Sequence, residues 1–321
     1  MTPTISPLPI EGSPDPGESL MGFVLRMSHE NHMNGIQWLR SVMQKARIFH
    51  LSRQHVPTIA WVFGATIESF ESSTVSQILN PTNSHWDFYS HYISRSYLIR
   101  HRTPQLCPRC IEEFGHIKKI WDLRAVTTCP NHQILLVDLC NGCNKPISWN
   151  RHSIFICRCK FDFRFSRTEQ LPEEDIRIAD DLEFKLEHAT LPFSSSNRTT
   201  PSILLNPLSI DGTARVIHAT GFLESPSDIL KVGESRKEIR TKEMHQITKR
   251  SMERLSRLIH DENPRKTCSA FLTSSLLELE NDGFTQNDRD LAHRILLLGR
   301  KGLPTRASLL SRNPRSQLNL F

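Results

Sequence analysis

Residues 106–162 read LCPRCIEEFGHIKKIWDLRAVTTCPNHQILLVDLCNGCNKPISWNRHSIFICRCKFD and hold seven of the eight cysteines in the chain. With one histidine, these cysteines form four close pairs of the types Cys-x2-Cys, Cys-x2-His and Cys-x-Cys. Such spacings turn two soft ligands toward one point, as tetrahedral Zn²⁺ requires. The eight side chains suffice for two zinc ions, and they are Cys107, Cys110, Cys129, His132, Cys140, Cys143, Cys157 and Cys159.

The pairs are most simply divided in sequence order. The first ion then takes the four ligands from Cys107 to His132, and the second takes the four from Cys140 to Cys159. An interleaved division uses the same pairs and stays open. Four protein ligands close each coordination shell, so we predict two structural ions rather than catalytic ones. Cys268 stands apart, and we expect it to be a small side chain in a helical core.

Length and composition favour a soluble protein of two or three domains. The chain has 321 residues, of which 38% are hydrophobic, and no apolar run approaches the eighteen residues that cross a bilayer. Residues 1–19 lack the cationic start and apolar middle of a signal peptide. We therefore expect a cytoplasmic protein with no membrane contact, and the reducing cytoplasm favours metal binding over disulfides for clustered cysteines.

The charge of the chain is modest and unevenly distributed. Its formal net charge is +6, and seven thiolates against two Zn²⁺ would reduce this value to about +3. Residues 291–321 carry six Lys and Arg residues and no acid, whereas residues 1–35 are acidic. This asymmetry favours a protein with two different partners, and a solvated C-terminal tail is the alternative interpretation.

Hydrophobic periodicity predicts a mainly α protein around a small central zinc-binding module. Residues 18–32 place apolar side chains at helical spacing, and so do residues 241–260 and 285–299, where Thr285 is the expected N-cap and Gly299 the expected stop. We predict an N-terminal helical, helix-turn-helix-like domain over residues 1–100 and a double zinc-finger module over 101–165. A connecting helix and linker follow over 166–205, and a C-terminal helical domain with a basic tail covers 206–321.

The helix-turn-helix prediction concerns residues 57–79. A helix before Gly64 would be followed by a short turn and a second helix that Thr66 caps. Two helices joined in this way bind the major groove of DNA in some proteins and only pack within a helical domain in others. Glu68 and Glu71, with no basic residue nearby, favour a structural or protein-binding use.

A basic face is predicted on the helix over residues 241–260. Arg250, Arg254 and Arg257 follow i, i+4, i+7 spacing away from the apolar stripe, with Lys249 beside them. These residues, together with Arg300 and Lys301, are the candidates for contacts to phosphates or to an acidic partner. Reversal of the three arginines to Glu is expected to leave folding intact. A merely solvated face is the alternative.

The order of short motifs resembles the TniQ/TnsD family of transposon target-selection proteins. The motifs are PGESL with Arg26, then CPRC, CPNH, CNGCNKPI and CRCKFD, within about Pro7 to Arg164. One position departs from the family pattern, because Lys160 stands where Cys-x-Cys is usually followed by glycine. The turn after Cys159 must therefore accommodate a side chain or take a different backbone angle.

The resemblance implies a non-enzymatic adaptor in DNA transposition. Such an adaptor links a target, either a DNA site or a CRISPR effector complex of the Cascade type, to the AAA+ ATPase that recruits the transposase. The resemblance also implies an N-terminal helix-turn-helix that contacts protein as well as DNA. A second copy of the chain is a further candidate partner.

Two other functions are considered. A zinc-containing, sequence-specific DNA-binding regulator would use the same fingers and helices, and it would recognise a defined site without other components. A metal-dependent nuclease would need an open metal site or a histidine general base. His85, Asp87 and His91 form the only such group in the sequence, and their aromatic neighbours favour a packed element over a catalytic one.

Overall fold

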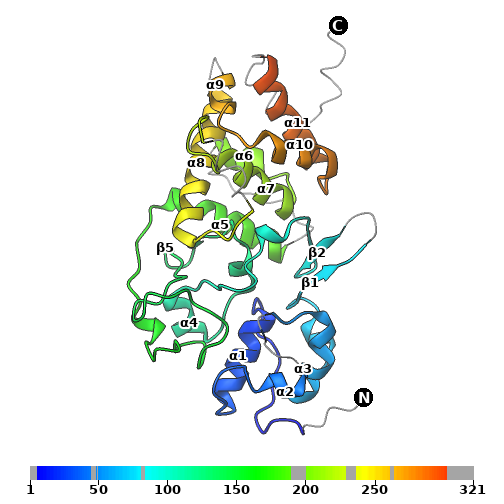
Figure 1. The fold of residues 1–321 in the computed structure, drawn as a ribbon, viewed down its shortest axis with the longest axis vertical. Helices are drawn as coiled ribbons and strands as arrows, with labels where there is room; N and C mark the ends of the chain where they lie inside the picture. Colours follow the sequence, from blue (N-terminus) through cyan, green and yellow to red (C-terminus); the bar gives the residue numbers. More distant parts are fainter. Residues whose placement is uncertain are drawn as a thin grey trace. The chain divides into compact units, whose positions relative to one another are not determined.

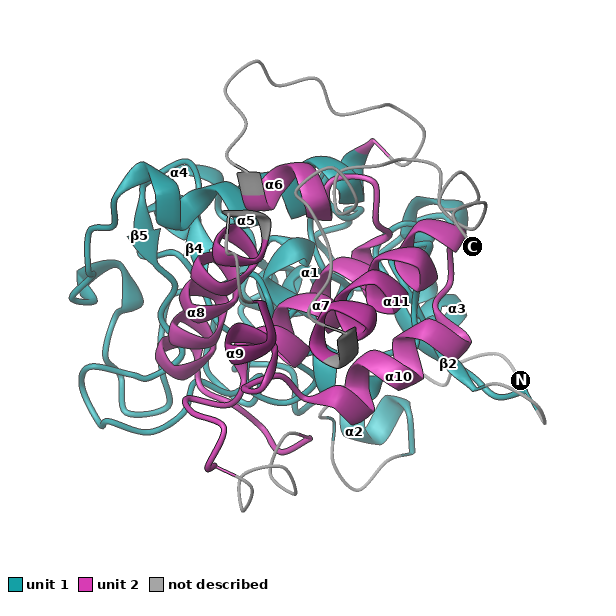
Figure 2. Cartoon of the chain, turned by 90° about the horizontal axis from the view of Figure 1, so that it is seen from above, with its two compact units in different colours: residues 1–187 teal, residues 188–321 magenta. Residues whose placement is uncertain are grey.

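The structure is a computed structural model that describes residues 6–301, apart from residues 45–47, 49, 81–83, 189–199, 229–235 and 261–263. The chain divides into two compact units, Met1–Glu187 and His188–Phe321, which Figure 2 colours separately. The finer predicted division into four segments stays a prediction, and residues 302–321 of the predicted basic tail lie outside the described residues. Over the described ranges, we find no helix with the length and apolar character to span a bilayer.

Unit 1 combines short helices with two small antiparallel sheets (Figure 1). Its α-helices are α1 (Leu20–Glu30), α2 (Leu39–Val42), α3 (Val56–Val62), α4 (Pro108–Phe114) and α5 (Glu173–Glu187). Its strands are β1 (Val75–Ile78), β2 (His85–Phe88), β3 (His91–Ile93), β4 (Thr128–Cys129) and β5 (Ile134–Leu135). Its 3-10 turns are η1 (Arg53–His55), η2 (Glu68–Phe70), η3 (Ser96–Leu98), η4 (Lys119–Asp122) and η5 (Phe163–Phe165).

The N-terminal core forms around α1. Ser19 caps the helix, since its hydroxyl oxygen accepts a hydrogen bond from the backbone N–H of Gly22 at 3.1 Å. Phe23 is fully buried, and its ring lies 5.2 Å from the rings of both Phe63 and Phe70 in edge-to-face contacts. These three rings fix α1 against α3 and against η2.

The second helix predicted over residues 66–79 is wrong. After α3 the chain forms η2 and then β1, which pairs antiparallel with β2 in the register Val75 to Phe88 and Ile78 to His85. β2 pairs in turn with β3, so the strand order is β1-β2-β3. The stretch Ser73 to Val75 has little helix propensity, and the hydrogen bonds offered by β2 outweigh the local preference for a helix. Residues 57–79 therefore do not form a helix-turn-helix.

Every described element of unit 2 is a helix. Together with the helices of unit 1 and the two cysteine clusters described below, this confirms the predicted mostly helical fold. Its helices are α6 (Thr200–Leu205), α7 (Ile210–Gly221), α8 (Thr241–His260), α9 (Pro264–Cys268), α10 (Thr273–Asp282) and α11 (Gln286–Lys301). All twelve residues of α7 are buried, and α8, α10 and α11 pack against it. Cys268 is buried in this unit, as expected.

Asp288 joins the N-termini of two helices in unit 2. Thr285 caps α11 as predicted, because its hydroxyl accepts from the Asp288 N–H at 3.2 Å while the Asp288 carboxylate accepts from the Thr285 N–H at 2.9 Å. The same carboxylate accepts from the N–H and the hydroxyl of Ser209, which is the N-cap of α7. The predicted stop at Gly299 is wrong, since α11 continues to Lys301.

Candidate metal centre

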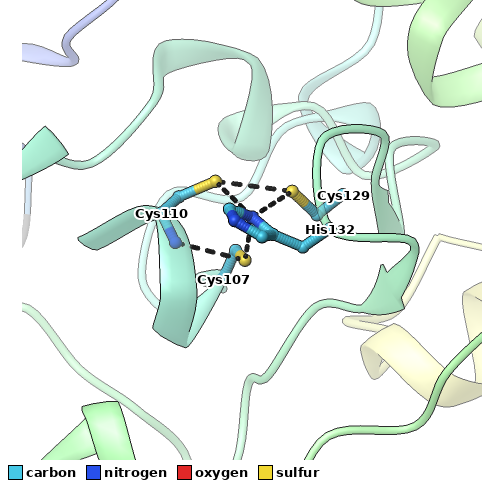
Figure 3. A group of neighbouring side chains, drawn as sticks. All are labelled: Cys107, Cys110, Cys129 and His132. Atoms are coloured by element: carbon cyan, nitrogen blue, oxygen red, sulfur yellow. Dashed lines mark hydrogen bonds between the residues drawn. The ribbon is translucent and has the colours of Figure 1, made fainter. Parts of the chain in front are cut away.

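The first cluster joins a helix N-terminus to a two-residue strand. Cys107 is the N-cap of α4 and Cys110 lies in its first turn, while Cys129 ends β4 and His132 follows in the turn toward β5. The Nδ1 atom of His132 lies 3.4 Å from Cys107 Sγ, 3.3 Å from Cys110 Sγ and 3.7 Å from Cys129 Sγ. Figure 3 shows the imidazole ring facing the three sulfur atoms.

The second cluster is built from two loops. Cys140 and Cys143 come from one loop and Cys157 and Cys159 from the other, and the Sγ atoms of Cys140 and Cys159 lie 3.6 Å apart. In each cluster the four ligand atoms lie within 4.8 Å of one another. Both clusters follow the division in sequence order, so the interleaved division does not occur.

Three of the four close pairs share one turn geometry. The residue after the second ligand has a left-handed φ: 53° at Gln133, 54° at Asn144 and 71° at Lys160. Its N–H donates to the carbonyl of the first cysteine of its pair, at 2.9 Å for Gln133, 2.8 Å for Asn144 and 2.9 Å for Lys160. This bond closes a tight turn with both ligands on its inner side. The expectation of an unusual backbone at Lys160 therefore agrees with the structure.

The second cluster also depends on a glycine between its first two cysteines. A Cβ atom added at Gly142 would lie 2.6 Å from Cβ of Phe161, far inside van der Waals contact. The Phe161 carbonyl accepts a hydrogen bond from the Cys157 N–H at 2.9 Å, so this phenylalanine belongs to the other loop of the cluster. Gly142 thus lets the two loops approach closely enough to share one ion.

The dimensions of both clusters fit a tetrahedral ion. With metal–sulfur bonds of about 2.3 Å and metal–nitrogen bonds of about 2.05 Å, tetrahedral angles place two sulfurs about 3.8 Å apart and a sulfur and a nitrogen about 3.6 Å apart. The sulfurs of Cys110 and Cys129 lie 3.4 Å apart, and the sulfur–nitrogen distances of the first cluster are 3.3 to 3.7 Å. Each cluster can therefore hold a metal ion with four protein ligands.

The ionisation of the cysteines supports the same conclusion. Hydrogen bonds to the neighbouring Cys107 and Cys129 and burial raise the pKa of Cys110, whereas the bonds that Cys129 accepts from Cys107 and Cys110 lower the pKa of Cys129. Crowded thiolates repel one another, so without a cation only part of the set ionises. A bound divalent ion removes this conflict, because it favours the thiolate at every ligand.

The two clusters differ in exposure. All three cysteines of the first cluster are fully buried. In the second cluster Cys140 is 1% exposed and Cys157 8% exposed, but Cys143 is half-buried and Cys159 is exposed. Solvent therefore reaches the second cluster more readily than the first.

Lys118 supplies a positive charge beside the first cluster, and sequence reasoning did not single it out. Its Nζ atom lies 2.7 Å from Oε1 of Glu183 in α5. Although burial lowers the pKa of Lys118, the hydrogen bond to Glu183 and the nearby Cys110 and Cys129 thiolates raise it overall. The ammonium group thus pairs with α5 and places a positive charge near the thiolates of the cluster. A lysine eight residues after a predicted ligand was the only signal in the sequence.

The PGESL motif has a structural role beside the cluster. Glu18 is fully buried and accepts two hydrogen bonds from the Arg26 guanidinium, from Nε at 2.9 Å and from Nη2 at 2.7 Å. On either side of Glu18, the Gly17 carbonyl accepts from the Lys119 N–H at 2.7 Å, and the Ser19 N–H donates to the Ile117 carbonyl at 3.0 Å. The motif therefore fixes the start of α1 to the segment that follows α4.

The predicted basic face of α8 is used partly inside unit 2. Arg254 donates to the carbonyls of Thr220 at 2.8 Å and Leu223 at 2.7 Å, and Arg250 donates to the carbonyl of Gly221 at 2.9 Å. These two guanidiniums cap the C-terminal end of α7, where helix carbonyls lack partners. We therefore expect reversal of these two arginines to Glu to destabilise unit 2, which argues against the expectation that folding stays intact.

The other predicted contact residues of unit 2 differ in the exposure of their side chains. Arg257 is exposed on α8 and Lys249 is half-buried. Arg300 and Lys301 lie in the last turn of α11, and their side chains are outside the described residues.

The group considered for a nuclease does not converge. His85 and Asp87 alternate along β2 and share one face of the sheet, while His91 of β3 pairs with Phe88 and belongs to the other face. The His91 ring bonds the Leu186 carbonyl at 3.1 Å. Between residues 6 and 301, as far as they are described, only the two cysteine clusters gather three or more metal-ligating side chains.

Comparison with known sequences identifies the region around the first cluster. No curated protein matches the chain significantly. The family model TniQ matches residues 9–136, which include the PGESL motif and all four residues of the first cluster and end before the second. TniQ proteins act in DNA transposition and are generally non-catalytic. Residues 9–136 of this chain are therefore a TniQ family domain.

Proposed function

We propose that the chain is a non-enzymatic target-selection adaptor for DNA transposition. It would link a target, either a DNA site or a CRISPR effector complex, to the AAA+ ATPase that recruits the transposase. The TniQ family domain over residues 9–136 is the observation that carries this proposal. An adaptor role is also consistent with the two clusters, whose four protein ligands leave no coordination position for a substrate.

The proposal includes two structural zinc ions, one in each cluster. Three cysteines with one histidine, and four cysteines, are donor sets typical of structural zinc, and soft thiolates bind zinc well in a reducing cytoplasm. Their thiolates reduce the formal charge of the loaded protein to about +3. Such a modest charge supports recruitment through protein contacts more than strong binding to bare DNA.

Metal analysis tests the zinc assignment. The purified chain should contain two zinc ions, and Cys107→Ser and Cys143→Ser should each remove one of them. Cys268→Ser is the matched control, because this cysteine is buried in unit 2 and belongs to neither cluster. A wild-type protein without zinc, or with clustered cysteines open to alkylation, would contradict the assignment.

The contact residues that we retain for this function are Lys249, Arg257, Arg300 and Lys301. Arg250 and Arg254 are left out of the tests because their donors bind carbonyls of unit 2. The double variant Lys249→Glu with Arg257→Glu should weaken docking to the ATPase or to nucleic acid, and more strongly at low salt than at high salt. Lys242→Glu, an exposed reversal on the same helix, is the control.

A transposition assay with a transposase and the AAA+ ATPase that recruits it tests the function as a whole. Removing the chain should abolish targeted insertion, and the purified chain should retain the ATPase while binding bare DNA weakly. Adding the effector complex, or the DNA site alone, to parallel reactions distinguishes the two target routes. A chain that footprints a defined sequence by itself and never retains the ATPase would instead be a DNA-binding regulator.

A further inference from the structure

His132 presents its two ring nitrogens to different partners. Nδ1 faces the three sulfur atoms of the first cluster, at 3.3 to 3.7 Å. Nε2 lies 2.8 Å from Oε1 of Glu113. The His132 side chain is 10% exposed and the Glu113 side chain 51% exposed, so the carboxylate covers the outer edge of the ring.

This arrangement selects one tautomer of the imidazole. A neutral histidine binds a metal ion through the nitrogen that carries no proton, and its proton then sits on the other nitrogen. An ionised carboxylate only accepts hydrogen bonds, so Glu113 requires the proton on Nε2. The lone pair of Nδ1 is then directed at the three sulfurs, where the ion would bind. The opposite tautomer would direct an N–H into the cluster and leave Glu113 facing a lone pair.

One helix supplies both the ligands and the carboxylate. Cys107, Cys110 and Glu113 follow one another at intervals of three residues from the N-cap of α4, so they lie along one side of the helix. Cys107 and Cys110 are fully buried under the ion site, and Glu113 reaches the ring from the exposed end of the same stripe. The position of Glu113 relative to the ligands is therefore set by α4 rather than by a separate loop.

The neighbouring Glu112 carries the same charge at a different position on α4. It is also exposed and also on α4, but it is adjacent to Glu113 and so projects about 100° away around the helix. Among the described acids, Glu113 is the one that the structure pairs with His132. Glu112 is thus a matched control on the same helix.

We propose that Glu113 is a positioning residue of the first metal site, which holds His132 in the Nε2–H tautomer and in the orientation that binds the ion through Nδ1. This inference rests on the proposed zinc occupancy of the site. Carboxylate partners of this kind typically change metal affinity by about 10- to 100-fold when they are removed. A surface glutamate outside the four ligands therefore controls how tightly the domain holds its metal.

Chelator competition on the full-length protein tests the proposal. The zinc content of the wild type is measured first, and Glu113→Ala, Glu113→Gln, Glu112→Ala and Glu112→Gln are then titrated with a chromophoric chelator. Glu113→Ala should lower the zinc affinity of one of the two sites about 10- to 100-fold, while the zinc affinities of both Glu112 variants stay within about twofold of the wild type. Glu113→Gln keeps an acceptor oxygen without the charge, and its effect should fall between these values. When Co²⁺ replaces zinc, Glu113→Ala should shift only the absorption bands of the site that contains nitrogen, relative to the Co²⁺-loaded wild type.

A double-mutant comparison separates the effect on the ring from an effect on the helix. In a His132→Cys background the site has four sulfurs and no tautomer, so Glu113→Ala should no longer change the affinity. Equal losses in both backgrounds would overturn the proposal, because the carboxylate would then act through α4. Equal affinities for the Glu113 and Glu112 variants would also overturn it while leaving two-zinc occupancy intact. A wild type without zinc would overturn this proposal and the zinc assignment together.

Discussion

Lys160 occupies a backbone conformation that glycine adopts without a steric penalty. Its φ of 71° places Cβ close to backbone atoms, and the residue nonetheless closes the turn that presents Cys157 and Cys159. Gln133 and Asn144 hold the equivalent conformation in the other two turns. Asparagine tolerates this region better than lysine does, because its short polar side chain bonds locally. The strain of the three turns is therefore greater at Lys160 than at Asn144.

Lys160→Gly should stabilise unit 1. Relief of the left-handed conformation contributes about 1–2 kcal/mol, and the greater entropy of glycine in the unfolded chain offsets about 0.4–1 kcal/mol of it. The expected net gain is about 0.5–1 kcal/mol in the free energy of unfolding. All five tryptophans, at positions 38, 61, 86, 121 and 149, lie in unit 1, so tryptophan emission in a denaturant titration measures this unit alone.

Asn144→Gly is the control for the lysine variant. It keeps the same φ at the equivalent position of the neighbouring turn, and its gain should be close to zero. If both glycine variants change the unfolding midpoint equally, relief of strain at Lys160 is not the cause.

At the scale of elements, the most consequential contact is the one that α8 makes with the end of α7. Five successive carbonyls at and after the end of α7 accept hydrogen bonds from Arg250 or Arg254. They are those of Thr220, Gly221, Phe222, Leu223 and Glu224. Gly221 allows this approach, since a Cβ there would lie 2.0 Å from the Ile247 carbonyl oxygen. The contact substitutes two side chains for the C-cap that a helix end otherwise requires.

Arg254→Ala should destabilise unit 2 by about 2–4 kcal/mol, because it removes charged donors from several carbonyls at once. Arg254→Lys keeps the charge but lacks the forked geometry, so it should recover only part of that loss. Hydrogen exchange at the amides of α7 and α8 measures the effect within this unit. Arg257→Ala, exposed on the same helix, should stay within about 0.5 kcal/mol of the wild type. Similar losses for Arg254→Ala and Arg257→Ala would show that the carbonyl contacts contribute little.

At the scale of the whole chain, the cysteine clusters and the described helices are distributed unequally. Both cysteine clusters lie within Met1–Glu187, whereas more than half of the described α-helical residues belong to His188–Phe321. Unit 2 has its own core around α7 and contains no member of either cluster among its described residues. The stability of the two units should therefore respond differently to metal removal.

Removal of zinc by a strong chelator should unfold unit 1 and leave most of unit 2 folded. Structural zinc contributes on the order of 10 kcal/mol in small finger peptides, which exceeds the usual margin of stability of a domain. Tryptophan emission should shift to the red while more than half of the far-UV helical signal persists. Simultaneous loss of both signals would show that the units fold as one. A chain that keeps both signals after the metal is gone would show that its clusters are not structural.

The sequence was most informative where the signal is local. The spacing of the cysteine pairs is enough to predict the two groups of four side chains that the structure brings together, since each pair closes within five residues. Helical periodicity likewise locates α1, α8 and α11 to within a few residues. The Thr285 cap is also a short-range pattern, because Asp288 follows at the third position.

The features that the sequence did not predict depend on distant partners. Residues 75–78 are a strand because residues 85–88 pair with them, and nothing in residues 66–79 alone encodes that partner. The role of Arg254 depends on where α7 ends, about thirty residues earlier in the chain. Glu113 is one of two adjacent acids, and only the turn that carries His132 decides which of them contacts the ring. Side-chain function of this kind requires the tertiary arrangement.

The end of the family match at residue 136 falls within a pairing of backbone segments. Beyond β4, strand β5 also bonds a later segment: the Leu135 N–H donates to the Glu169 carbonyl at 3.0 Å, and the Leu171 N–H donates to the Gln133 carbonyl at 2.8 Å. Excision at residue 136 would remove these partners and the second cluster, and it would leave the outer side of β5 as an open edge available to other chains. A fragment cut at the family boundary should therefore tend to aggregate, whereas one that continues to Glu187 keeps the edge covered and both metal sites complete.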